Sequence, residues 1–107
     1  MASFEEELES QITRDKAIVE RGKALKRLLN SSDFRNVILS GFLREYALQL
    51  VYDRADSQSS DDETSRKIDG VAQFKRYLDN VLSEAEVADK SVNESTEQLY
   101  QLRNEEE

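Results

Sequence analysis

The feature that most constrains the fold of this chain is a heptad repeat in its second half. Side chains suited to a helix seam recur at alternating steps of three and four residues, without a slip, through more than four heptads. The series consists of Val71, Phe74, Leu78, Val81, Ala85, Ala88, Val92, Ser95, Leu99 and Leu102. This spacing puts all ten side chains on one stripe of an α-helix, as in coiled coils. It predicts one long helix over residues 62–104, with Ser95 as the polar member of its seam.

The composition also favours helices. The 107 residues include no proline and three glycines, so few positions oppose helix formation. Apolar residues make up 37% of the chain and charged residues 36%, which leaves little material for a large compact core. We therefore expect one helical domain over residues 1–107, with a compact part at about 30–82 and helices 3–29 and 83–104 projecting from it.

The N-terminal segment is predicted to form a second long helix, over residues 3–29. Ser3 and Glu6 have the spacing of a capping box, which marks a helix start. Apolar residues follow a heptad seam at Phe4, Leu8, Ile18, Leu25 and Leu29. Polar or small residues occupy the steps between, at Gln11, Asp15 and Gly22. The seam is therefore predicted to be weak in its middle.

A dense apolar run, SDFRNVILSGFLREYALQLVY, covers residues 32–52. Ser31 or Ser32 can cap a helix here, and the pair Ser40-Gly41 interrupts the apolar pattern. We expect a helix over 32–54 with a kink or short break at that pair and a second piece from about residue 42. Its apolar arc is broad, as in a helix covered on more than one side.

The predicted fold is all-α. Two long helices, 3–29 and 62–104, flank the shorter kinked helix 32–54 in an elongated hairpin of coiled-coil character. The polar residues 55–63 read as a loop and lack the spacing of a calcium-binding EF-hand.

Charge is distributed unevenly along a chain whose net charge is −8. Residues 14–27 are net basic and residues 84–107 are net acidic. These segments can pair with each other within one chain or between chains, or remain two solvated faces that never meet. Direct binding of nucleic acid is not expected, because the chain is acidic and no aromatic side chain lies among the basic residues.

The side chains that usually carry catalysis are missing. The sequence has no cysteine and no histidine, no glycine-rich phosphate loop and no nucleophile motif. No carboxylate lies in an apolar setting that would shift its pKa. We expect no enzymatic activity, no cofactor, no small-molecule substrate and no metal. No apolar run approaches the roughly 20 residues of a membrane span, so a soluble intracellular protein is expected.

The expected interaction surfaces are helical. The helix over 68–82 can cover one face of the apolar run and leaves the other for a second chain. The residues predicted to form protein interfaces are Phe34, Ile38, Phe42, Leu43, Val81, Ala85, Ala88, Val92, Leu99 and Leu102.

Two strings in the middle of the chain resemble a known group of proteins. These are D-F-x-x-V-I-x-x-G-F-x-x-x-x-A-x-x-L-V at residues 33–51 and I-D-x-V-x-x-F-x-x-Y-L at 68–78. They are similar to small acidic helical proteins of tailed bacteriophages, often encoded among virion structural genes. The resemblance covers roughly residues 25–83, and a proline expected in the acidic loop is absent.

The resemblance implies a non-enzymatic phage protein, present in the host cytoplasm during assembly and then in the virion. Such a protein would bind copies of itself, as a homo-oligomer, or a larger virion protein such as a capsid, scaffold or connector protein. An alternative is a small regulatory phage protein that binds a host protein. A third possibility is a helical hairpin without a fixed partner.

Overall fold

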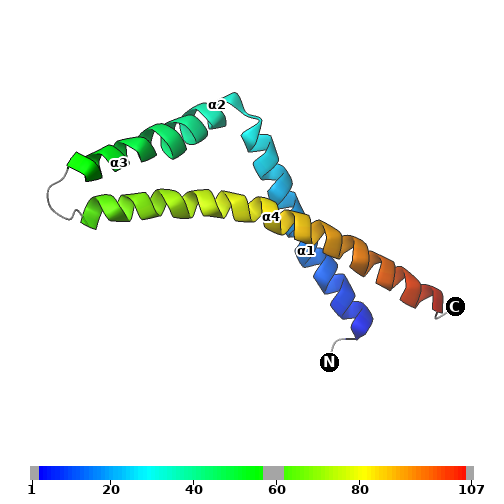
Figure 1. Ribbon diagram of the computed structural model, residues 1–107. Coiled ribbons are helices and arrows are strands. Elements are labelled where there is room, and N and C mark those ends of the chain that lie inside the picture. The colour runs from blue at the N-terminus through cyan, green and yellow to red at the C-terminus, as the bar shows by residue number, and fades with distance from the viewer. Residues whose placement is uncertain (1–2, 57–61, 106–107) are drawn as a thin grey trace. The chain divides into compact units, whose positions relative to one another are not determined.

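The computed structural model describes residues 3–56 and 62–105. The described residues form α1 (Phe4–Leu29), α2 (Ser32–Phe34), the π-helix η1 (Arg35–Tyr46), α3 (Ala47–Asp56) and α4 (Asp62–Glu105) (Figure 1). They contain no β-strand. The predicted all-α fold, in which two long helices flank a shorter irregular one, is confirmed.

Both predicted helix starts in the first half of the chain are capped by serine. The Ser3 hydroxyl accepts a hydrogen bond from the Glu6 N–H at 3.1 Å, at the start of α1. The Ser31 hydroxyl accepts one from the Phe34 N–H at 3.3 Å, at the start of α2. Each bond satisfies a donor that a helix N-terminus otherwise leaves unpaired.

The irregularity expected at Ser40-Gly41 takes the form of a π-helix. The chain is helical without interruption from Ser32 to Asp56, so the alternative of a short break, with a new piece from about residue 42, is wrong. A Cβ atom added at Gly41 would lie 3.2 Å from the carbonyl oxygen of Asn36, five residues earlier. Glycine therefore suits a backbone wound in the wider turns of a π-helix.

The predicted loop over residues 55–63 is shorter than expected at both ends. Residues 55 and 56 still belong to α3, and residues 62 and 63 already belong to α4. The remainder of that prediction, residues 57–61, lies outside the described residues.

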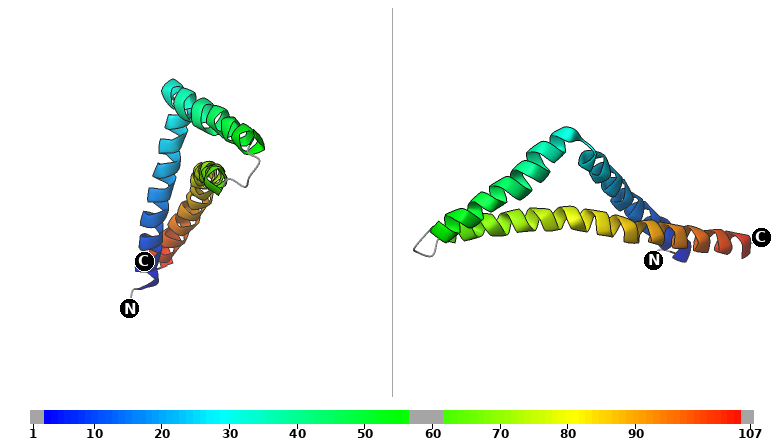
Figure 2. Two further views of the ribbon diagram at one scale, coloured as in Figure 1. Left: turned by 90° about the vertical axis from the view of Figure 1, so that its left-hand side faces the viewer. Right: turned by 45° about the horizontal axis from the view of Figure 1, so that its top comes forward.

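The chain divides into two compact units. Among the described residues, unit 1 comprises 3–25 and 81–105, and unit 2 comprises 26–56 and 62–80. In unit 1, most of α1 runs antiparallel to the C-terminal part of α4 (Figure 1). In unit 2, α3 and the beginning of α4 run in opposite directions (Figure 2).

The heptad seam of α4 is the buried stripe of that helix. All ten seam residues are buried or half-buried, and Val71, Val81, Ala88, Ser95 and Leu99 are buried. Most of the seam predicted for the N-terminal helix is likewise turned inward, but its first residue, Phe4, is exposed. Its buried members are Leu8, Asp15, Gly22 and Leu25. The residues interpreted as interruptions, Asp15 and Gly22, are thus part of the packed surface.

The helix pair of unit 1 is closest where Gly22 of α1 meets Ala85 of α4. A Cβ atom added at Gly22 would overlap the Cβ atom of Ala85. Two small residues at one level of the seam let the helix backbones approach each other closely. This contact explains why Gly22 is tolerated inside a helix, where glycine costs about 1 kcal/mol relative to alanine.

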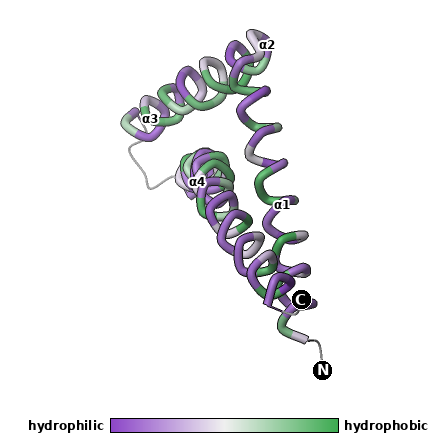
Figure 3. The backbone as a smooth tube through the Cα atoms, turned by 90° about the vertical axis from the view of Figure 1, so that its right-hand side faces the viewer, coloured by the Kyte–Doolittle hydropathy of each residue, from purple (hydrophilic) through white to green (hydrophobic). Residues whose placement is uncertain are grey.

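The core of unit 2 is apolar and aromatic. Leu50 and Val71 are buried. The ring of Phe42 stacks on that of Tyr46, with centroids 5.5 Å apart, and meets the ring of Phe74 edge-on at 5.6 Å. Such ring pairs add about 0.5–1.5 kcal/mol each beyond their burial. Figure 3 shows that hydrophobic residues are denser along η1 and α3 than along α1.

Candidate protein-binding surface

An apolar groove lies between two helical segments of unit 2. It has a volume of about 190 Å³. Its lining residues are Leu43, Ala47, Leu50, Val51, Ile68, Val71, Ala72 and Lys75. Four of them come from η1 and α3, and four from α4, where the spacing of i, i+3, i+4 and i+7 keeps them on one helix face. We call this surface the α3–α4 groove.

The groove has a buried floor and an exposed apolar edge. Leu50, at its floor, is 3% exposed, whereas Val51, beside it on α3, is 53% exposed. Leu48 and Tyr52 are also exposed. Val51 and Tyr52 lie three and four residues after Leu48, so each is a neighbour of Leu48 on the helix surface. Contiguous exposed apolar side chains of this kind are typical of interaction surfaces.

Phe34, Ile38, Phe42 and Leu43, the predicted interface residues of the apolar run, are all half-buried. Phe42 packs on the ring of Phe74, and Leu43 lines the α3–α4 groove. The remaining predicted residues lie in the α4 part of unit 1. Of these, Val81, Ala88 and Leu99 are buried, whereas Ala85, Val92 and Leu102 are half-buried. Only Leu43 therefore belongs to the groove, and the assignment of the others to interfaces stays a prediction.

The sequence prediction did not include Leu48, Val51 or Tyr52. It placed residues along 32–54 with the regular 3.6-residue turn of an α-helix. The wider turns of η1 change the angular position of each residue before α3 begins. In a continuous α-helical projection, Leu48 and Tyr52 lie within about 40° of Phe34, so the regular spacing could have identified both. Val51 lies about 100° from Phe34 and is not grouped with it.

A polar cluster centred on Asp15 is the other notable site. The Gln11 side-chain amide donates to both carboxylate oxygens of Asp15 at 3.0 Å, and Arg14 donates to the Gln11 carbonyl oxygen at 2.8 Å. Asp15 is buried beside an open cavity of about 340 Å³, which includes residues of α4 such as Val87. This cluster belongs to unit 1.

Hydrogen bonds from the side chains of Ser91 and Gln11 hold the pKa of Asp15 below its ordinary value, against the opposing effect of its burial. The prediction concerned carboxylates in an apolar setting, whereas the pKa of Asp15 is lowered by hydrogen bonds. A carboxylate with a lowered pKa is a weak base. The cluster is therefore better suited to positioning α1 against α4 than to transferring protons.

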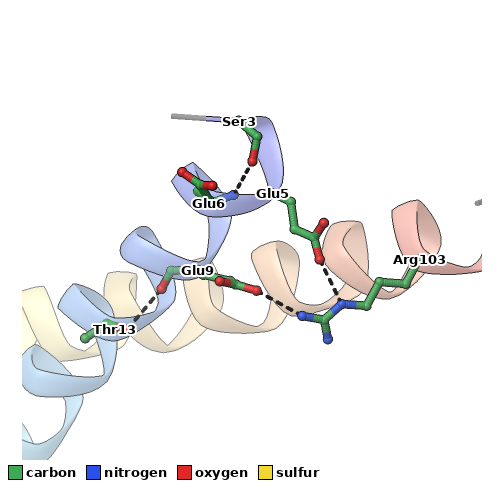
Figure 4. A network of polar contacts seen from close by, with 6 residues as sticks. All are labelled: Ser3, Glu5, Glu6, Glu9, Thr13 and Arg103. Atoms are coloured by element: carbon green, nitrogen blue, oxygen red, sulfur yellow. Dashed lines mark hydrogen bonds and ion pairs between the residues drawn. The ribbon is translucent and has the colours of Figure 1, made fainter. Parts of the chain in front are cut away.

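Arg103 of α4 joins the two helices of unit 1 at the surface. Its guanidinium donates to Glu5 at 3.1 Å and to Glu9 at 3.0 Å, both in α1 (Figure 4). This contact is not the pairing of residues 14–27 with residues 84–107 that the sequence left as one of two alternatives. No ion pair within residues 3–56 and 62–105 joins a basic side chain of 14–27 to an acidic one of 84–105.

Two further properties of the described residues bear on function. Within residues 3–56 and 62–105, no helix is long and apolar enough to cross a membrane. The same residues hold no cluster of three or more potential metal-ligating side chains suited to a metal ion.

The fold and the groove define an all-α chain with a partly exposed apolar groove. Comparison with known proteins finds no matching family model, curated protein or solved structure.

Proposed function

We propose that this chain is a non-enzymatic structural or assembly protein of a tailed bacteriophage, which binds protein partners through the α3–α4 groove. The partner is a second copy or a larger virion protein, such as a capsid, scaffold or connector protein. The observation that carries the proposal is the exposed apolar edge formed by Leu48, Val51 and Tyr52 beside an apolar groove.

Burial of this apolar edge by a partner would drive the association. Complete burial of a large aliphatic side chain contributes about 1.5–3 kcal/mol. Part of that gain is offset by the entropy lost on association. An apolar helix laid into the groove would cover the edge and the lining side chains together, in the helix-in-groove mode of recognition.

The phage assignment is supported by where the resembling strings lie. Both strings, at 33–51 and 68–78, fall within unit 2. Five positions of these strings also line the groove. They are Ala47, Leu50, Val51, Ile68 and Val71. The resemblance is thus concentrated on the surface to which we assign binding.

The proposal is tested by an inventory of purified phage particles combined with one pair of variants. Mass spectrometry should find the chain in particles at a fixed, high copy number. Val51→Asp, which puts a charge at the groove, should abolish this association. Val87→Asp is the matched control, because Val87 is 69% exposed, lies in unit 1 and is not part of the groove. Val87→Asp should leave the association intact.

Absence of the chain from particles would contradict the virion role. If the chain then captured a host protein, and Val51→Asp abolished the capture, the role of a regulatory binder would replace it.

A further inference from the structure

The α4 wall of the α3–α4 groove is centred on a small residue. Ile68, Ala72 and Lys75 line the groove from this helix, and Ala72 lies in the middle. A second helix can approach closely at an alanine, with the larger side chains packing one turn away on either side. The wall is therefore suited to a partner helix that crosses at Ala72.

The charges on either side of Ala72 are opposite in sign. Asp69 lies three residues before it, and Lys75 and Arg76 lie three and four residues after it. All three charged side chains are exposed. Lys75 is already ion-paired with Asp79 of the same helix at 2.9 Å, so Arg76 is the cation that remains for a second copy. Asp69 and Arg76 are seven residues apart, so they occupy equivalent positions on the same flank of the helix.

These charges attract those of a second copy when the two α4 helices lie antiparallel. If a second α4 lies antiparallel with its own Ala72 at the crossing point, Asp69 of each copy faces Arg76 of the other. A two-fold axis forms this attractive contact twice. A parallel copy in the same register would instead bring like charges together, which is unfavourable.

Unit 2 also buries little of its apolar material. Among residues 26–56 and 62–80, the buried hydrophobic side chains are Leu50 and Val71. Small domains with so small a core commonly gain stability by oligomerisation. A second copy on the groove would cover Ala72 and Ile68 and shield the exposed edge at Val51.

We infer that the α3–α4 groove binds a second copy of this chain, antiparallel and with a two-fold axis near Ala72. The inference rests on the proposed function in taking the groove as the binding surface, and it names the partner and its orientation.

A single engineered thiol tests this geometry directly, because the natural chain contains no cysteine. Ala72→Cys places one thiol on each copy beside the two-fold axis, where a disulfide can form only if the Cα atoms approach to about 4–7 Å. Mild oxidation of the full-length variant should give a covalent dimer. Val87→Cys, an exposed position in unit 1, is the control and should form dimer at least about tenfold more slowly.

Charge exchange tests the orientation independently. Asp69→Lys and Arg76→Glu should each weaken the dimer about tenfold, because each turns two attractive contacts into two repulsive ones. The double variant should recover most of the lost affinity. Sedimentation equilibrium measures the dissociation constant, and circular dichroism verifies that each variant remains helical.

Three results would overturn the inference: a monomer at all concentrations, equal oxidation rates of the two cysteine variants, or a double variant as weak as the singles. If the dimer is absent but Val51→Asp still removes the chain from particles, the groove binds a different chain and only this inference fails. If the dimer behaves as expected but the chain is absent from particles, only the proposed function fails.

Discussion

The two units use the same long helix, α4, in different ways. Unit 1 buries Asp15, Gly22 and Ser95 between its helices and is joined at the surface by Arg103. Unit 2 is built on an aromatic cluster and an open apolar groove. Of the ten large hydrophobic residues that are exposed among the described ones, seven belong to unit 2. They are Leu28, Val37, Tyr46, Leu48, Val51, Tyr52 and Tyr77.

The difference shows how one heptad stripe can serve two purposes. In unit 1, small and hydrogen-bonded residues allow the helices to close on each other and fix their relative register. In unit 2, large side chains on both helices leave apolar surface that the chain does not cover. Unit 1 is accordingly interpreted as the self-contained half of the molecule, and unit 2 as the half that binds.

The largest effect is expected from the core of unit 2. Leu50→Ala should lower the free energy of unfolding by about 2–4 kcal/mol, because Leu50 is almost fully buried and its truncation leaves a cavity. Leu48→Ala, the same change two residues earlier at a 50% exposed position, should alter stability by less than about 0.5 kcal/mol. Urea unfolding of dilute protein, followed by circular dichroism, measures both. Equal losses would contradict the assignment of the buried and exposed faces of α3.

The next largest effect concerns the close contact in unit 1. Gly22→Ala should cost about 1–2 kcal/mol, because the added methyl group overlaps Ala85 and the helices must move apart. Gly70→Ala is the matched control, since nothing lies within 4 Å of its added Cβ atom. It should stabilise the protein by about 0.5–1 kcal/mol through helix propensity.

Adding Ala85→Gly to Gly22→Ala should restore most of the stability that Gly22→Ala removes, because the overlapping methyl group is then absent. A stabilising effect of Gly22→Ala alone would show that the helices are further apart than described.

An effect of about the same size is expected from the polar cluster. Asp15→Ala should cost about 1–2 kcal/mol at neutral pH, since it removes the acceptor for Gln11 and Ser91. The pKa of Asp15 is lowered in the folded state, so the stability due to its ionised form is complete above the unfolded value of about 3.9. That stability is lost as the pH falls through the lowered folded pKa.

The difference in unfolding free energy between the natural chain and Asp15→Asn should therefore be constant above about pH 5 and shrink below about pH 4. Chemical unfolding at a series of pH values measures it. A difference that grows on acidification would mean that the pKa is raised instead of lowered.

The surface ion pairs should matter least. Arg103→Met should cost no more than about 1 kcal/mol, because Arg103, Glu5 and Glu9 are all solvent-accessible. The loss should diminish in high salt, which screens exposed charges. A loss that is large and independent of salt would place Arg103 among the residues that hold unit 1 together by packing.

The features of the fold that depend on regular periodicity were predicted from the sequence. The bounds of α1 and α4, the seam from Val71 to Leu102 and the cap at Ser3 all follow from local rules and agree with the structure. The form of the irregularity around Gly41 did not follow, because a change from α to π turns depends on backbone geometry that no residue pattern specifies.

The periodic pattern of the sequence also could not predict the role of Asp15. A carboxylate at a seam position weakens an apolar pattern, and the compensating hydrogen bond comes from Ser91, far away in the sequence. Similarly, the presence of a glycine at position 22 is explained only once Ala85 is known to face it. The structural roles of both residues depend on the pairing of α1 with α4.

The central claim is that partners bind the groove of unit 2 and leave unit 1 free, and tyrosine oxidation tests it most directly. Tyr52 and Tyr100 are similarly exposed, at 57% and 66%, and lie in unit 2 and unit 1 respectively. Hydroxyl-radical footprinting with mass spectrometry should compare dilute chain with associated chain. Association should slow oxidation of Tyr52 several-fold and leave Tyr100 unchanged. Protection of Tyr100 with Tyr52 unaffected would contradict the account.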